Sequence, residues 1–199
     1  MPELSTALLG RIAVCFALGS IPFAVVSMWG TGVDITTFGS GNPGFNNVLR
    51  YSKVRAIFCL IGDVGKGLLA TWLFARPGVI GVEEWLFGMA AVIGHCFSPW
   101  LKFKGGKGIA TAAGVMLYLY PVILLPCVMV YVALRFIGGR KQWKERGFIA
   151  SISASILFTI LLLSRESMQM AALGVALLAF VAWRHKRNIQ VLADPTASH

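Results

Sequence analysis

Charged side chains are scarce in this sequence. They make up 13% of its 199 residues, whereas 57% of the residues are hydrophobic, and a soluble globular domain carries about 25% charged residues. Acidic side chains are the scarcest, with 8 Asp and Glu against 18 Lys and Arg. The composition therefore indicates a chain whose main solvent is the interior of a lipid bilayer.

Cysteine motifs are also lacking. The four cysteines lie far apart in apolar stretches with no C-x-x-C spacing: Cys15, Cys59, Cys96 and Cys127. Such spacing is typical of buried thiols rather than a disulfide scaffold or a zinc site. The net charge of +10 is concentrated in clusters between apolar runs, not along one amphipathic face, so we expect no nucleic-acid partner.

Apolar runs long enough to cross a hydrocarbon core of about 30 Å recur along the chain. They predict transmembrane helices near Leu4–Trp29, Val54–Phe74, Val82–Leu101, Gly108–Phe136, Phe148–Leu163 and Met168–Trp183. The first run is too long for a signal-peptide core and lacks a basic leader, so we expect it to remain as a helix. No linker or low-complexity segment separates the runs, and we expect one domain over residues 1–199.

The basic residues gather in four clusters: Arg50, Lys53 and Arg55; Lys102, Lys104 and Lys107; Arg140, Lys141, Lys144 and Arg146; Arg184, Lys186 and Arg187. Lys and Arg are retained on the cytoplasmic side of short loops. The run Gly108–Phe136 is too long for one upright crossing. All four clusters lie on the same side of the membrane only if this run breaks near Pro121 into two helices.

We therefore expect an all-α integral membrane protein, a bundle of seven transmembrane helices. Its N-terminus would lie outside, and its C-terminus and motif loops would face the cytoplasm. Since the two halves of the split run are short, the Lys104–Gly108 turn or the Pro121 turn should lie below the membrane surface, where irregular backbone is tolerated only against protein or a water-filled cavity.

The first polar motif is Gly39–Arg50, which is rich in glycine and asparagine. Its glycines, Gly41 among them, permit tight turns that expose backbone N–H groups, and Arg50 offers a planar fork for phosphate. Neutral donors are added by Ser40, Asn42, Asn46 and Asn47. The motif predicts an anion cradle; the alternative is a polar turn with an Asn cap on the next helix.

The second polar motif is Lys104–Thr111, in which Lys104 and Lys107 flank Gly105 and Gly106 ahead of an apolar run. Amides at a helix N-terminus together with two lysines favour a bound phosphate. No Ser or Thr follows Lys107 and no Gly stands five residues before Gly106, which excludes an ATPase P-loop. The alternative is a positive-inside anchor with a flexible turn.

The third polar motif is Trp183–Ile189, at the end of the last apolar run. His185 and Asn188 are three residues apart and would share a face if the helix continues; taken alone, the segment is a basic anchor. At membrane depth Asp63, Lys66 and His95 are costly, so we expect them to be paired and inward-facing. For Asp63 structural and functional roles are both open, and for His95 a structural role is expected.

The three motifs, in this order and at these distances, resemble those of the bacterial acyl-phosphate:glycerol-3-phosphate acyltransferase family, which makes lysophosphatidic acid in the membrane. Gly39–Arg50 is similar to the family's GSGN-x-GATN-x-x-R segment, Lys104–Thr111 to KGGKG-x-AT, and His185–Ile189 to H-x-x-NI. The resemblance covers essentially the whole chain. The departures are Phe45, Asn46 and Val191, where the family usually has Ala, Thr and a basic residue.

The resemblance implies a multi-pass protein of the bacterial inner membrane that uses no metal and no coenzyme A, and hence no cofactor. Its substrates would be acyl phosphate and glycerol 3-phosphate, and its partners membrane lipids and the enzyme that supplies acyl phosphate. By motif position the resemblance assigns catalysis to Ser40, Asn42, Lys107, His185 and Asn188. It assigns phosphate binding to Gly41, Asn46, Arg50, Lys104, Gly105, Gly106 and, more weakly, Ser151.

Two other function classes fit the same loops. A transporter of phosphorylated organic anions would use basic motifs as a gated site, although its polar groups should reach both faces of the membrane. A non-enzymatic lipid-headgroup binder is the second alternative. Acyl transfer by purified protein in detergent, without any sealed compartment, would exclude both.

Overall fold

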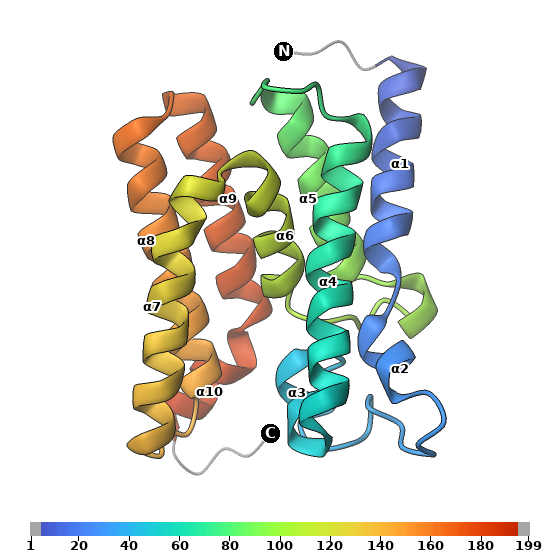
Figure 1. The fold of residues 1–199 in the computed structure, drawn as a ribbon, viewed down its shortest axis with the longest axis vertical. Coiled ribbons are helices and arrows are strands. Elements are labelled where there is room, and N and C mark those ends of the chain that lie inside the picture. Colours follow the sequence, from blue (N-terminus) through green and yellow to red (C-terminus); the bar gives the residue numbers. More distant parts are fainter. Residues whose placement is uncertain (1–4, 195–199) are drawn as a thin grey trace. The chain divides into compact units, whose positions relative to one another are not determined.

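The computed structural model describes residues 5–194 (Figure 1), and every regular element in that range is a helix. Four helical segments are long and apolar enough to cross a membrane: Thr6–Met28, which contains a break, Lys53–Phe74, Pro121–Arg140 and Arg146–Arg165. A bent pair, Met168–Arg184 with Lys186–Ala193, makes a fifth if it counts as one span. The all-α prediction is confirmed for the described residues, while the count of seven crossings stays a prediction.

The chain divides into two compact units, unit 1 (Met1–Leu119) and unit 2 (Tyr120–His199). The expected single domain over 1–199 thus stays a prediction. In unit 1 the central helix is α4 (Lys53–Phe74). It packs against α1 (Thr6–Ser20), α2 (Phe23–Met28), α3 (Phe45–Tyr51), α5 (Val82–Cys96) and α6 (Ile109–Leu119).

Small residues allow these helices to approach closely. A Cβ on Gly67 of α4 would collide with the backbone of Thr111 in α6, and a Cβ on Gly114 of α6 would collide with the backbone of Val64 in α4. Packing through small residues is how apolar helices associate where lipid tails remove the hydrophobic drive between them. The helix predicted over Val54–Phe74 is confirmed, and Gly67 allows its close packing against α6.

The first apolar run, predicted near Leu4–Trp29, forms one candidate membrane span over Thr6–Met28, but that span is broken and is not one continuous helix. α1 ends at Ser20 and α2 begins at Phe23, because Pro22 has no N–H to donate and its ring clashes with a continuing helix. The carbonyl of Ile21 accepts a hydrogen bond from Lys66 Nζ at 2.7 Å. Leu4 lies outside the described residues.

α5 is shorter than the predicted helix Val82–Leu101. It ends at Cys96, and a 3-10 turn, Pro99–Leu101, follows. Its 15 residues rise about 22 Å, less than the hydrocarbon core of about 30 Å. Near its end His95 contacts Asp63, which lies halfway along the 22-residue α4. α5 therefore stops level with the middle of α4, and the loop that follows begins deep inside unit 1.

The run Gly108–Phe136 splits as predicted. α6 ends at Leu119, and α7 (Pro121–Arg140) begins at Pro121, because the first position of a helix needs no N–H from its residue. Pro126 lies inside α7. With 11 residues, α6 rises only about 16 Å and is too short to cross a bilayer by itself.

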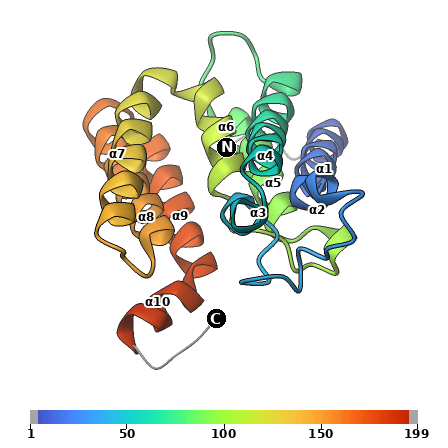
Figure 2. The ribbon, with the colours of Figure 1, turned by 60° about the horizontal axis from the view of Figure 1, so that its bottom comes forward.

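Unit 2 consists of α7, α8 (Arg146–Arg165), α9 (Met168–Arg184) and the short α10 (Lys186–Ala193), with α8 packed against both α7 and α9. The predictions of helices over Phe148–Leu163 and Met168–Trp183 are confirmed. At His185 the chain bends by 60° between α9 and α10 (Figure 2). The third motif therefore lies at a helix junction, not on a straight continuation of α9.

Candidate active site

Asn47 organises the first motif from inside. Its Nδ2 donates to the carbonyls of Ile35 at 3.0 Å and Phe38 at 2.8 Å, and its Oδ1 accepts from the Ser40 backbone N–H at 3.1 Å. The residue is 1% exposed. The interpretation of Asn47 as a donor toward an anion was wrong, because both N–H groups of its amide are bonded within the loop.

The outer side of this loop carries the other predicted residues. Gly39 and Gly41 have φ of +56° and +66°, a left-handed conformation that glycine adopts without strain. Arg50 folds back over Gly39, with Nη1 3.5 Å from the position that a Cβ there would occupy. Arg50 and Asn46 are exposed and Ser40 is half-buried, as are Gly41 and Asn42. The loop thus presents one guanidinium group beside small polar groups.

The second motif rests on the end of α5. The Gly105 N–H donates to the Cys96 carbonyl at 3.1 Å, and the Gly106 N–H donates to the His95 carbonyl at 3.2 Å. A Cβ on Gly105 would collide with the carbonyl of His95, and a Cβ on Gly106 with its imidazole ring. These two amides are therefore bonded within the protein. Close approach to His95 explains both glycines, and Lys104 and Lys107 carry the positive charge of the loop.

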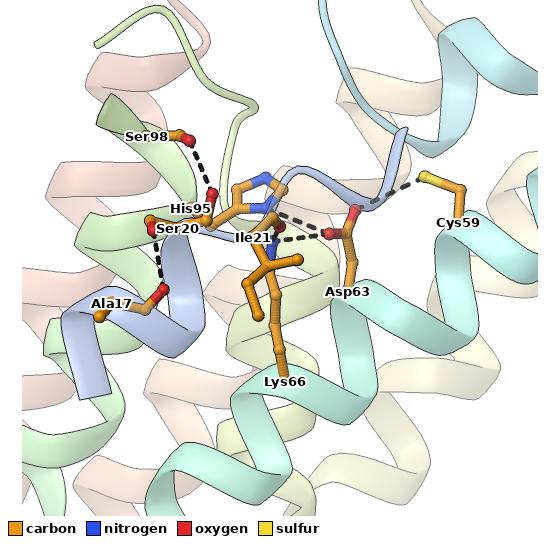
Figure 3. A network of polar contacts seen from close by, with 8 residues as sticks. All are labelled: Ala17, Ser20, Ile21, Cys59, Asp63, Lys66, His95 and Ser98. Atoms are coloured by element: carbon orange, nitrogen blue, oxygen red, sulfur yellow. Dashed lines mark hydrogen bonds and ion pairs between the residues drawn. The ribbon is translucent and has the colours of Figure 1, made fainter. Parts of the chain in front are cut away.

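His95 belongs to a buried ionic network (Figure 3). Asp63 Oδ1 lies 2.8 Å from Lys66 Nζ and 3.4 Å from His95 Nδ1, and Lys66 also donates to the Ile21 carbonyl. None of the three ionisable side chains is more than 7% exposed. The expected paired, inward-facing arrangement is confirmed. The network joins the break between α1 and α2 to the loop of the second motif.

The third motif is held by the start of α8. Since a carbonyl can only accept, His185 Nδ1 donates to Val181 at 2.8 Å, and the Phe148 ring packs on the imidazole with centroids 5.4 Å apart. Asn188 Nδ2 donates to Glu145 Oε2 at 2.5 Å. His185 and Asn188 are 4% and 5% exposed. Both predicted residues are thus buried and held by contacts from another helix.

Ser151 lies on a row of hydroxyl groups along α8. Its Oγ donates to the Gly147 carbonyl at 2.8 Å, and Ser155 and Thr159 repeat the pattern toward the carbonyls four residues earlier. Such back-bonding is local to the helix and places no demand on other elements. The geometry of Ser151 is thus that of an ordinary buried serine of an apolar helix.

The predicted site residues are divided between the two units. Unit 1 contains the first two motifs, and unit 2 contains Ser151, His185 and Asn188. Sequence reasoning missed Glu145, because 43 residues separate it from Asn188 and it lies in a basic cluster that indicates topology. The four cysteines are buried thiols, as predicted. Within residues 5–194 no three His, Cys, Asp or Glu side chains are grouped as metal ligands.

A family model, curated relatives and solved structures all indicate the same family for this chain. The model of the glycerol-3-phosphate acyltransferase family matches residues 9–194. The chain is 38% identical to the glycerol-3-phosphate acyltransferase of Aromatoleum aromaticum, over 94% of this chain and 93% of that protein. It is 39% identical to that of Pseudomonas paraeruginosa, over 90% of this chain and 92% of the relative.

Solved structures agree. The chain is similar to the crystal structure of PlsY, an integral membrane glycerol 3-phosphate acyltransferase, in its glycerol 3-phosphate form, with a TM-score of 0.80 and 30% identity over 94% of this chain and 92% of that one. The lysophosphatidic acid form of PlsY gives a TM-score of 0.79 and 31% identity over the same shares. Because the family model spans both units and all three motifs, this chain belongs to the glycerol-3-phosphate acyltransferase family.

Proposed function

We propose that this protein transfers a fatty acyl group from acyl phosphate to glycerol 3-phosphate, giving lysophosphatidic acid and phosphate in the first step of phospholipid synthesis. The observation that carries the proposal is the match of the family model over residues 9–194, which includes all three motifs. Support comes from PlsY, whose crystal structures are a glycerol 3-phosphate form and a lysophosphatidic acid form.

The basic residues would hold the two phosphate groups. Arg50 extends from the loop that Asn47 organises, and Lys104 and Lys107 extend from the loop that rests on His95. Guanidinium and ammonium groups form the strong, charge-assisted hydrogen bonds that phosphate requires. Neutral side chains would complete the binding of the substrates: Ser40, Asn42, Asn46 and Ser151. The predicted glycines Gly41, Gly105 and Gly106 would shape the loops instead, because their N–H groups donate to carbonyls within the protein.

The acyl group passes directly from donor to acceptor. The primary hydroxyl oxygen of glycerol 3-phosphate bonds to the acyl carbon, the bond from that carbon to the phosphate oxygen breaks, and the departing phosphate takes the hydroxyl proton. Phosphate, with a second pKa of about 6, can accept that proton. Asn188 would donate to the carbonyl oxygen as negative charge develops there, and His185, buried beside it, would orient the acceptor.

A covalent acyl-enzyme is not needed for this reaction. Within residues 5–119 the Ser40 hydroxyl makes no hydrogen bond to a histidine or a carboxylate, the usual activators of a serine nucleophile. Incubation of the enzyme with labelled acyl phosphate alone should leave no acyl group on the chain, and kinetics should require both substrates together. A hydroxylamine-sensitive adduct on Ser40, formed and consumed at the rate of turnover, would refute direct transfer.

The deciding experiment uses purified protein in detergent with acyl phosphate and glycerol 3-phosphate, without coenzyme A. Formation of lysophosphatidic acid supports the proposal and excludes a transporter or a headgroup binder, whereas no product rejects it. Lys107→Met should lower turnover by at least about tenfold, roughly the 1.4 kcal/mol of one charged contact. Lys102→Met, at an exposed lysine of the same loop, is the matched control and should keep full turnover.

The membrane arrangement is part of the proposal. Seven crossings, of which α5 and α6 are too short to span alone, would place the N-terminus outside and all motif loops at the cytoplasmic face of the bacterial inner membrane, beside the enzyme that supplies acyl phosphate. Single cysteines at Gly139 and Asp194, in a background without native cysteines, should resist an impermeant thiol reagent in intact cells. Labelling of position 139 from outside would refute seven crossings.

A further inference from the structure

The turn before α8 contains the buried carboxylate of Glu145, which bonds to a motif residue of another helix. Glu145 is 8% exposed and occupies the N-cap position of α8, where its backbone carbonyl accepts from the Ile149 N–H at 3.0 Å. The side chain of an Asp, Asn, Ser or Thr at such a position accepts from amides of the first helical turn. The Glu145 side chain makes no such bond. It accepts instead from Asn188, a residue of the third motif.

This contact determines which way the Asn188 amide faces. A carboxylate only accepts hydrogen bonds, whereas an amide has a donating and an accepting end. Nδ2 of Asn188 must therefore face Glu145 with one of its two N–H groups. This fixes the plane of the amide and the direction of the second N–H, which is the donor that the proposed reaction directs at the carbonyl oxygen. A neutral partner such as glutamine would not enforce this choice, because glutamine presents either end.

The same helical turn holds the other motif residue. Phe148, three residues after Glu145, packs on His185, which lies three residues before Asn188. Glu145 and Phe148 lie one turn apart on α8, and they contact Asn188 and His185, which lie one turn apart at the junction of α9 and α10. Burial of a carboxylate is costly unless it is hydrogen-bonded, and α8 does not use Glu145 as a cap.

We propose that Glu145 is a positioning residue for acyl transfer, which fixes the Asn188 amide in the one orientation that the reacting carbonyl requires. The inference rests on the proposed function and deepens it. Glu145 acts through Asn188 and does not contact the substrates. Its removal should therefore lower kcat and leave the KM for glycerol 3-phosphate nearly unchanged.

The test exchanges donor and acceptor between the two positions. Glu145→Ala should lower kcat at least about tenfold, and Glu145→Gln about threefold, with KM changed by less than about twofold. Asn188→Asp should lose both thermal stability and turnover, because two carboxylates then face each other. The double variant Glu145→Gln, Asn188→Asp restores the hydrogen bond in reverse, so its Tm should return to near the wild-type value while kcat stays at the level of Asn188→Asp.

Several outcomes would overturn the inference. Wild-type kcat in Glu145→Ala would remove any positioning role, and recovery of kcat together with Tm in the double variant would make the pair merely structural. If Glu145→Ala does not fold, the glutamine variant and the double variant still decide between these results. Glu166→Gln, at the far end of α8, is the matched control and should behave as wild type. Failure of the proposed function would be distinct, since the wild-type protein itself would then form no lysophosphatidic acid.

Discussion

In unit 1 the polar loops are held by backbone hydrogen bonds, by closely packed glycines and by a buried ionic network. In unit 2 the motif residues are held by two side chains from one turn of α8. The loop at Gly105 and Gly106 is pressed against His95, which Asp63 and Lys66 support. His185 and Asn188, by contrast, are held at the junction of α9 and α10 by Phe148 and Glu145.

This difference separates two kinds of substitution. A change beneath the loops of unit 1 removes buried partners or inserts atoms into backbone contacts, so stability and activity should fall together. A change at the side-chain contacts of unit 2 reorients a group without collapsing a loop, so activity should fall more than stability. The buried network of unit 1 is tested by stability alone, and Asn47, Gly106 and Ser151 are tested by stability and turnover together.

Breaking the Asp63–Lys66 pair should have the largest effect. Asp63→Asn keeps the shape but leaves Lys66 buried without a counter-charge, which costs about 3–5 kcal/mol of stability. The double variant Asp63→Asn, Lys66→Met should recover much of that loss, because it removes both charges. Thermal unfolding in detergent measures both.

The control for this pair is a surface ion pair. Glu83 lies 3.9 Å from Arg76, whose side chain is 60% exposed, and Glu83→Gln should change stability by less than about 1 kcal/mol. Equal Tm values for Asp63→Asn and Glu83→Gln would mean that the buried network does not support unit 1.

The next largest effect is expected at Asn47. Asn47→Asp has the same shape but cannot donate, so the carbonyls of Ile35 and Phe38 would face a carboxylate. We expect a loss of about 2–3 kcal/mol for the buried groups left unpaired, with a parallel loss of turnover. Asn46→Asp is the stability control, since Asn46 is exposed and its Tm should not change. An Asn47→Asp protein as stable as Asn46→Asp would remove Asn47 as the organiser of the loop.

The long apolar helices could be predicted from hydropathy. Helix breaks inside an apolar run could not, because the hydropathy does not change there. α4, α8 and α9 follow from their apolar runs, and the split at Pro121 follows from the charge of the loops. The break at Pro22 was missed because its surroundings are as apolar as the helix. The end of α5 at Cys96 was missed for the same reason, since Phe97 and Trp100 continue the apolar run.

The sequence suggests which motif residues could bind substrate, and their roles stay predictions, whereas the residues that hold them in place could not be predicted. Side-chain chemistry singles out Arg50, Lys107 and Asn188 because phosphate and carbonyl groups need such partners. The role of Asn47 depends on which of several neighbouring polar side chains turns inward, which spacing cannot determine. Glu145 acts on a residue distant in sequence, so only the folded chain reveals the pair.

Gly106→Ala tests the close approach to His95 and should have an intermediate effect. Its methyl group would meet the His95 ring, and overpacking of this kind costs about 1–3 kcal/mol. We expect lower Tm and lower turnover. His95→Ala should remove the obstacle, so that adding Gly106→Ala to it should cost little more. Additive losses in the double variant would mean that the ring is not what excludes a side chain at position 106.

The smallest effect is expected at Ser151, and it tests unit 2 with a control from the same helix. Ser151 and Ser155 each donate to the carbonyl four residues earlier at 2.8 Å, so Ser151→Ala and Ser155→Ala should change stability equally and by little, since back-bonding of this type does not strengthen a helix. If Ser151 also contacts a substrate, Ser151→Ala should lower turnover about fivefold, near the 1 kcal/mol of one neutral hydrogen bond, while Ser155→Ala should not. Steady-state kinetics of the two variants at equal folded concentration decide the point. Equal turnover would remove Ser151 from the site and leave His185 and Asn188 as the polar residues through which unit 2 acts.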